Sequence, residues 1–140
     1  MDEKSRDKLA TCTDRLQMLF YTVDARYPCN ISDGHRSPER QKELFLAGKS
    51  KVEFSKHNYM PSRAVDAQPL PVNFGGPLIN TDGTLNGENL SALLRFYRFS
   101  GYVHGVADVL DVPLRSGDDW DGDQDIDDQT FNDLNHFEII

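Results

Sequence analysis

The chain has 140 residues, of which 38% are hydrophobic and 27% charged, a composition typical of a folded domain rather than a disordered segment. Its formal net charge is −8, and eight of its 23 acidic residues are aspartates between Asp118 and Asp133, a segment without Lys or Arg; the other 15 acids balance the 15 basic residues. No basic stripe remains for nucleic acid, and no apolar run approaches the roughly 20 residues that cross a bilayer. We expect one monomeric domain over residues 1–140, with no nucleic-acid partner and no membrane insertion.

The cysteines and the N-terminus suggest little covalent or targeting chemistry. Cys12 and Cys29 are too few for a disulfide framework. Cys12 lies on an apolar helical stripe and is expected to be a buried thiol, with a Cys12–Cys29 bridge as the alternative. The first four residues, Met1 to Lys4, lack the basic start and apolar stretch of a secretory signal. Either the mature chain begins here or it is exported by another route.

The first predicted element is one amphipathic helix over residues 3–26, ended by Pro28. Its apolar residues recur at helical spacing; they are Leu9, Cys12, Leu16, Leu19, Phe20 and Val23. A short strand is predicted around residues 30–33.

A second helix is predicted from Ser37 to about Ala47. Ser37 provides an N-cap, the next residue is a proline suited to the first turn, and Gly48 is the expected C-cap. Residues 49–62 show no periodicity and are expected to be irregular. A short strand is predicted over residues 64–67.

The second half of the chain predicts further helices. Residues 73–86 are rich in Gly, Asn and Asp, which indicates a hairpin or a long loop. A third helix begins near Glu88 and a fourth follows it, with the break between them placed only loosely near Gly101 and Gly105. The third helix is expected to bury Leu90, Leu93, Leu94 and Tyr97, and the fourth Val103, Val106, Ala107 and Leu110.

Two last strands, at residues 113–115 and 136–140, are predicted to flank the acidic loop. The whole pattern indicates the α+β class, with helices around a small, antiparallel sheet.

A metal site is suggested by two of the four histidines. Zinc prefers imidazole nitrogen and carboxylate oxygen, and a catalytic site uses three protein ligands plus water. His57, Asp66 and His136 would supply such a set. By spacing alone the indication is weak, because a single histidine is more often a surface or core residue and Asp66 could equally cap a turn.

The same residues carry a resemblance to a known family. Its pattern is Ser-x-His, then Ala-x-Asp, and an acid three residues before a His near the C-terminus; this chain has Ser55, His57, Ala64, Asp66, Asp133 and His136. An upstream Arg36-Ser37, Gln41, the stretch Gly48-Lys49-Ser50 and the loop Trp120-Asp121-Gly122-Asp123 agree with it. The chain resembles the peptidoglycan metallopeptidases that include D-alanyl-D-alanine carboxypeptidases, the dipeptidases of vancomycin resistance and phage L-alanyl-D-glutamate endopeptidases.

One departure concerns the spacing of the ligands. His57 and Asp66 are nine positions apart, whereas the family usually separates them by seven, and Ser62 stands where a glycine is usual. The loop between the two ligands is therefore expected to bulge around Pro61.

The resemblance implies roles for the site residues. One zinc ion would be held by His57, Asp66 and His136. Asp133 would act as the general base and acid, and Arg36 would stabilise the developing oxyanion or anchor a substrate carboxylate. As alternatives, Arg36 would only pair with a nearby acid, and Asp133 would be one more acid of the loop. Ser55 and Glu138 are expected to orient a ligand imidazole, and Gln41 and Trp120 to contact substrate or cover the site.

The aspartates of the loop could bind calcium weakly. They do not follow the EF-hand pattern, because Gln124 or Ile126 stands where its glycine belongs and no Glu occupies the twelfth position. A solvated loop is the simpler interpretation.

The resemblance implies a fold of the hedgehog/DD-peptidase type and zinc-dependent hydrolysis of a bond in the peptidoglycan stem peptide. Cleavage after L-alanine, as in phage endolysins, is favoured. D-alanyl-D-alanine carboxypeptidase activity and a non-catalytic zinc-binding domain are the alternatives. We expect a protein made in the host cytoplasm that acts on the cell wall at lysis, or one carried in the virion.

Overall fold

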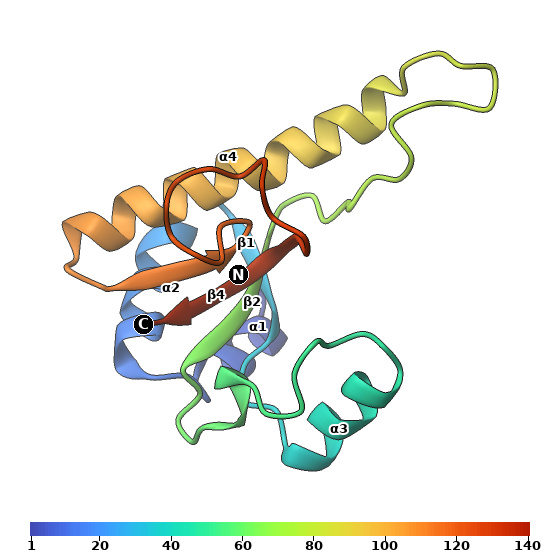
Figure 1. Cartoon of the computed structure of the whole chain (residues 1–140). Coiled ribbons are helices and arrows are strands. Elements are labelled where there is room, and N and C mark those ends of the chain that lie inside the picture. The colour runs from blue at the N-terminus through green and yellow to red at the C-terminus, as the bar shows by residue number, and fades with distance from the viewer.

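The computed structural model describes residues 1–140 as four α-helices, a short 3-10 helix and four strands (Figure 1). In chain order these are α1 (Glu3–Leu9), α2 (Asp14–Asp24), β1 (Cys29–Asp33), α3 (Pro38–Leu46), η1 (Lys56–Asn58), β2 (Ala64–Pro69), α4 (Gly87–Val109), β3 (Leu114–Gly117) and β4 (Asp133–Ile139). The strands form one antiparallel sheet in the order β1-β2-β4-β3. The predicted α+β class, with a small antiparallel sheet flanked by helices, is confirmed.

One face of the sheet packs against the hydrophobic core, and the other carries Asp66 and His136. Val65 of β2 and Phe137 of β4 are fully buried in the core, and the Phe137 ring lies 5.5 Å from that of Phe20 in α2. Helix α4 contacts β2, β3 and β4, α1 contacts β1, and α2 contacts α4. Because successive strand side chains point to opposite faces, Asp66 and His136 point away from this core. The helices thus bury one face and leave the other for a site.

The predicted single helix over residues 3–26 is wrong in one respect, because it is two helices with a break between them. The backbone N–H of Thr13 donates to the Ser62 carbonyl oxygen at 2.9 Å, and the N–H of Ser62 donates to the Thr11 carbonyl at 2.8 Å. These bonds to a distant segment replace the helical bonds. The apolar stripe is confirmed, since all six of its residues are buried, and Cys12 and Cys29 are free thiols.

Helix α3 begins as predicted. The Ser37 hydroxyl accepts a hydrogen bond from the backbone N–H of Arg40, Pro38 occupies the first turn, and Gly48 follows the helix with a φ of 70°. Figure 1 shows α3 apart from the sheet, on a long connection between β1 and β2. This connection carries η1, and with it the first predicted metal ligand.

Helix α4 is continuous through Gly101 and Gly105, so the predicted break is wrong. Both glycines are exposed, and a Cβ on either would meet no neighbouring atom. The predicted buried face of its first half is wrong in part: Leu94 is 57% exposed, Leu90, Leu93 and Tyr97 are half-buried, and the fully buried residues are Ala92, Phe96 and Phe99. Phe99 packs against Tyr27 and Phe137 of the core, and the Phe74 ring, from the segment after β2, stacks on Phe96 at 5.1 Å.

Residues 70–86 form a projecting arm beside the start of α4 (Figure 1). Ile79 and Leu85 form an antiparallel bridge around a turn in which Gly83 has a φ of 84°, so the predicted hairpin is present in short form. Across the whole chain, no helix combines the length and the apolar character required to cross a membrane.

Candidate metal centre

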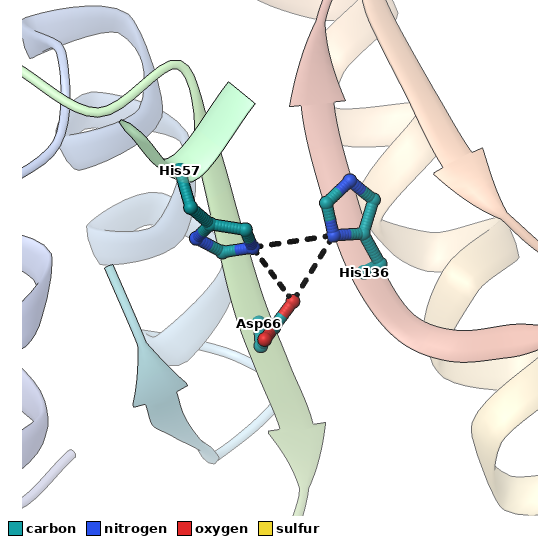
Figure 2. Close-up of side chains that lie close together, drawn as sticks. All are labelled: His57, Asp66 and His136. Atoms are coloured by element: carbon teal, nitrogen blue, oxygen red, sulfur yellow. Dashed lines mark hydrogen bonds and ion pairs between the residues drawn. The ribbon is translucent and has the colours of Figure 1, made fainter. Parts of the chain in front are cut away.

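His57, Asp66 and His136 converge at one point, as Figure 2 shows. Asp66 and His136 are directly paired in the β2–β4 register, and therefore lie side by side on the face that the helices leave open. His57 reaches the same point from η1, which Ser55 caps. The sequence places these three residues up to 79 positions apart, and the sheet register brings them together.

The three converging atoms have the spacing of zinc ligands. His57 Nε2 and His136 Nδ1 each lie 3.1 Å from Asp66 Oδ1, and 3.3 Å from each other. Ligands at about 2.0–2.1 Å from a tetrahedral zinc ion are separated by about 3.3–3.4 Å. The donor set of two imidazoles and one carboxylate also suits this ion. The residues present therefore fit a zinc ion with three protein ligands.

Both imidazoles are held by a bond on the ring nitrogen that faces away from the cluster. His57 Nδ1 donates to the Gly34 carbonyl oxygen at 2.6 Å, and His136 Nε2 donates to Glu138 Oε2 at 3.2 Å. A carbonyl and a carboxylate only accept, so these nitrogens carry the protons. His57 Nε2 and His136 Nδ1 are thereby directed at Asp66. Such outer contacts are typical of metal-binding histidines.

The surroundings of the cluster favour a positive charge at its centre. Burial alone would lower the pKa of His136, but hydrogen bonds to Asp66 and Glu138 raise it to about 9. Burial opposes ionisation of Asp66 as well, yet bonds from His136 and His57 hold the pKa of its carboxyl well below the usual range. A cation between these groups is stabilised by two carboxylates in a low-dielectric site.

Arg36 binds the side of Asp66 that faces away from the histidines. Its Nη2 donates to Asp66 Oδ2 at 3.1 Å, its Nε donates to Asp33 at 2.8 Å, and its Nη1 donates to Gln41 at 2.9 Å. The guanidinium thus fixes the orientation of a candidate metal ligand. The pairing with nearby acids was one expectation for Arg36, and its contact with substrate stays a prediction.

Gln41 and Ser55 were predicted to touch substrate and a ligand imidazole. The Gln41 side chain is fully buried, accepts from Arg36 and donates to Ser50 and the Val52 carbonyl. The structure therefore places Gln41 behind the wall of the site, not in it. Ser55 accepts from the backbone N–H of His57 at 3.3 Å, so it positions the turn that carries His57 rather than the imidazole ring.

Arg115 is a site residue that the sequence patterns did not single out. Its Nε and Nη2 donate to the same oxygen of Glu138, and its Nη1 donates to the carbonyl of Trp120 at 3.1 Å. The Trp120 ring lies 5.3 Å from His136, and its indole N–H donates to the Phe131 carbonyl. Arg115 therefore connects β3, the acidic loop and the Glu138–His136 pair. The sequence held one indication that Arg115 pairs with an acid, because it is the only Lys or Arg after Arg98.

Asp133 stands at the edge of the same site, at the start of β4. Burial raises the pKa of its carboxyl, and the neighbouring charge of Asp66 raises it further. Gly117 lies opposite in the β3–β4 pair, and a Cβ on Gly117 would collide with the Asp133 carbonyl oxygen and lie only 2.8 Å from its Cβ. A glycine at this position therefore permits the strand approach that places Asp133 beside the histidines.

The extra residues between His57 and Asp66 form an exposed turn at Tyr59 and Met60. Ser62, which replaces the usual glycine, is fully buried; its hydroxyl donates to the Ala64 carbonyl at 2.7 Å. The expected bulge is present, and Ser62 anchors its end beside β2. Asp66 consequently keeps its place opposite His136.

A cavity of about 760 Å³ opens over the cluster. His57, Asp66 and His136 line it together with Asp133, Arg36 and Trp120. The segment 49–56 contributes one wall, and residues 129–131 of the acidic loop contribute to another. A substrate in this cavity would thus contact the cluster directly.

The acidic loop brings the carboxylates of Asp119, Asp121 and Asp123 within 4.8 Å of one another. Asp119 accepts from the backbone N–H groups of Gly122 and Gln124, at 2.9 and 3.0 Å. Weak calcium binding here stays a prediction. We expect millimolar calcium chloride to raise the melting temperature above that in sodium chloride of equal ionic strength, because only calcium coordinates the oxygens. Equal melting curves would leave only general screening.

The fold and the cluster define an α+β domain with a candidate metal site on the open face of its sheet. The crystal structure of the L-Ala D-Glu endopeptidase ChiX from Serratia marcescens is similar, with a TM-score of 0.71 and 21% identity over 100% of this chain and 89% of that chain. A search of curated proteins gives no match. The chain belongs to the phage L-alanyl-D-glutamate peptidase family, whose sequence model matches residues 1–140. The predicted family is confirmed.

Proposed function

We propose that this chain is a zinc-dependent endopeptidase that hydrolyses the L-alanyl-D-glutamate bond of the peptidoglycan stem peptide. The observation that carries this proposal is the His57–Asp66–His136 triangle, which has zinc-ligand spacing and opens into a cavity large enough for a peptide. The family and the fold agree with it.

A zinc ion, when bound by these three residues, supplies Lewis-acid chemistry that polarises a carbonyl and lowers the pKa of water to about 7. The chain's own residues must then orient the peptide and move protons. Asp133 is the candidate for proton movement, because its carboxyl lines the cavity and makes no hydrogen bond within the chain that would occupy it. It would accept the proton of the attacking water and deliver one to the leaving amine.

Arg36 and Trp120 complete the proposed site. Arg36 holds Asp66 in the orientation that directs Oδ1 at the histidines. It also lines the cavity, and the one N–H that its bonds to Asp33, Gln41 and Asp66 leave over is the candidate donor to the scissile carbonyl oxygen. Trp120 covers His136 and excludes water from that side. Glu138 holds the other nitrogen of His136.

Glu138→Gln is expected to weaken zinc affinity about 10- to 100-fold, because outer carboxylates raise the basicity of a ligand imidazole and fix its orientation. Arg115 and His136 hold the pKa of Glu138 at about 2 despite its burial, so the group is ionised at neutral pH. Competition with a fluorescent zinc chelator measures the change. Glu43→Gln, which alters an exposed residue of α3, is the control and should bind zinc as wild type does. If Glu138→Gln binds zinc as tightly as this control, Glu138 does not contribute to zinc binding.

The bond that is cut is tested with purified peptidoglycan and mass analysis of the released fragments. The proposal expects new peptides that begin with glutamate and glycan chains that keep alanine. Release of free D-alanine would instead indicate a carboxypeptidase. A chelator should stop the reaction and added zinc should restore it; hydrolysis that survives complete zinc removal would contradict the zinc dependence.

A further inference from the structure

The cavity over the cluster is positively charged in a strongly acidic protein. Its lining has five cationic side chains, namely Arg36, Lys49, Lys51, Lys56 and Arg115, against the three carboxylates of Asp66, Asp133 and Glu138. The chain as a whole carries a net charge of −8. A cleft of one sign within a surface of the other attracts ligands of the opposite charge. The lining therefore favours an anionic ligand.

Most of these cations are already occupied by groups of the chain. Arg36 is paired with Asp33 and Asp66, Arg115 is paired with Glu138, and Lys56 donates to the Ile139 carbonyl at 3.2 Å. The two arginines balance carboxylates that hold the site together, whereas the carbonyl that Lys56 meets is uncharged. Of the three lysines that keep the cavity positive, only Lys49 and Lys51 have no hydrogen-bond partner for the ammonium group.

Lys49 and Lys51 are the cations without such a partner. Both are exposed, and both lie on the wall that follows α3. The Lys51 ammonium lies 5.5 Å from the centre of the Phe131 ring, which belongs to the opposite wall. This contact holds the Lys51 ammonium beside another lining residue of the cavity. A ligand bound in the cavity can therefore reach this ammonium group.

We propose that Lys49 and Lys51 form a subsite for a free carboxylate of the substrate peptide, next to the bond that is cut. The inference rests on the proposed function and specifies its substrate further. A glutamate on the amine side of the scissile bond has two carboxyl groups; when the peptide continues from one of them, the other is free. That group is either a carboxylate or, where it has been amidated, a neutral amide. The lysine pair distinguishes these two forms, and the enzyme is selective for the carboxylate.

The test uses the zinc-loaded full chain and two synthetic stem peptides that differ only in this carboxylate or amide. Wild type is expected to hydrolyse the carboxylate peptide with a kcat/KM about tenfold higher, since a charge-assisted bond at a partly exposed site contributes modestly. The double variant Lys49→Gln/Lys51→Gln should reduce that preference to about twofold or less. The loss should appear mainly in KM, because the carboxylate does not change during the reaction. Hydrolysis of the amide peptide should fall much less than that of the carboxylate peptide, so that the ratio of the two kcat/KM values reports the subsite.

Lys42→Gln is the matched control, because Lys42 is an exposed lysine of α3 that does not line the cavity. It should keep the wild-type preference. Calorimetric binding of the product peptide that begins with glutamate, in both forms, gives a second measurement that does not depend on turnover. The inference is overturned if wild type hydrolyses and binds both forms equally, or if the double variant keeps the preference; the proposed function then stands. If wild type hydrolyses neither peptide, the proposed function fails and the inference fails with it.

Discussion

Replacing His57 or His136 by alanine is expected to reduce bound zinc from about one ion per chain to none and to abolish peptide hydrolysis. Each histidine supplies one of only three protein ligands, and two ligands do not hold a catalytic zinc ion at the low free-zinc levels left after purification. Both rings are almost fully buried, so water cannot easily replace them while the site keeps its shape. Elemental analysis of protein purified without added metal measures the zinc content directly.

The control for this prediction is His104→Ala. His104 bonds Ser116 at 2.8 Å, on the α4 side of the sheet, and does not line the cavity. It should keep its zinc and its activity. Full zinc retention in His57→Ala or His136→Ala would show that the ion, if any, binds elsewhere.

Asp133→Asn is expected to keep zinc and lower kcat by about 100- to 10,000-fold, the usual contribution of a general acid–base group. The amide has the same shape but accepts no proton at neutral pH. Because Asp133 is not one of the three converging ligands, zinc content and melting temperature should stay close to wild type. Steady-state hydrolysis of a stem peptide, measured beside elemental analysis, separates loss of chemistry from loss of metal.

Asp128→Asn removes an acid from the same loop without touching the cavity, since Asp128 is exposed and does not line it. It should hydrolyse peptide at the wild-type rate. Activity of Asp133→Asn within a few-fold of wild type would make Asp133 one more acid of the loop and would require another residue to move the proton.

The sequence predicted the residues of the site better than their contacts. His57, Asp66 and His136 were identified through a motif, and the structure brings them together. Arg115 was missed because its contact with Glu138 depends on the β3–β4 register, which no local pattern reveals. Gln41 matched the motif, but its burial follows from how α3 packs against the segment after it.

The errors in the fold have the same origin. Local periodicity found the apolar stripe of residues 9–23, but the break within it arises from backbone bonds to Ser62, about 50 positions away. In α4 the glycines suggested a break, but each costs only about 1 kcal/mol in a helix, and burial of Phe96, Phe99 and Val103 offsets that cost. Core contacts of Phe99 with Tyr27 and Phe137, and the stacking of Phe74 on Phe96, determine which side of α4 is buried. Contacts between segments far apart in the sequence therefore determine the helix boundaries and buried faces that local propensity does not predict.

The place of β4 in the sheet has a consequence for fragments of the chain. This strand is the last in sequence, yet it lies between β2 and β3 and carries both Asp133 and His136. Its pairing with β2 closes a loop of about 70 residues, and closing a loop of this length has an entropic cost that the pairing must offset. A chain that lacks β4 would have neither Asp133 nor His136, the proposed proton-transferring acid and third ligand. We therefore expect fragments without this strand to bind no zinc at the site and to hydrolyse no peptide.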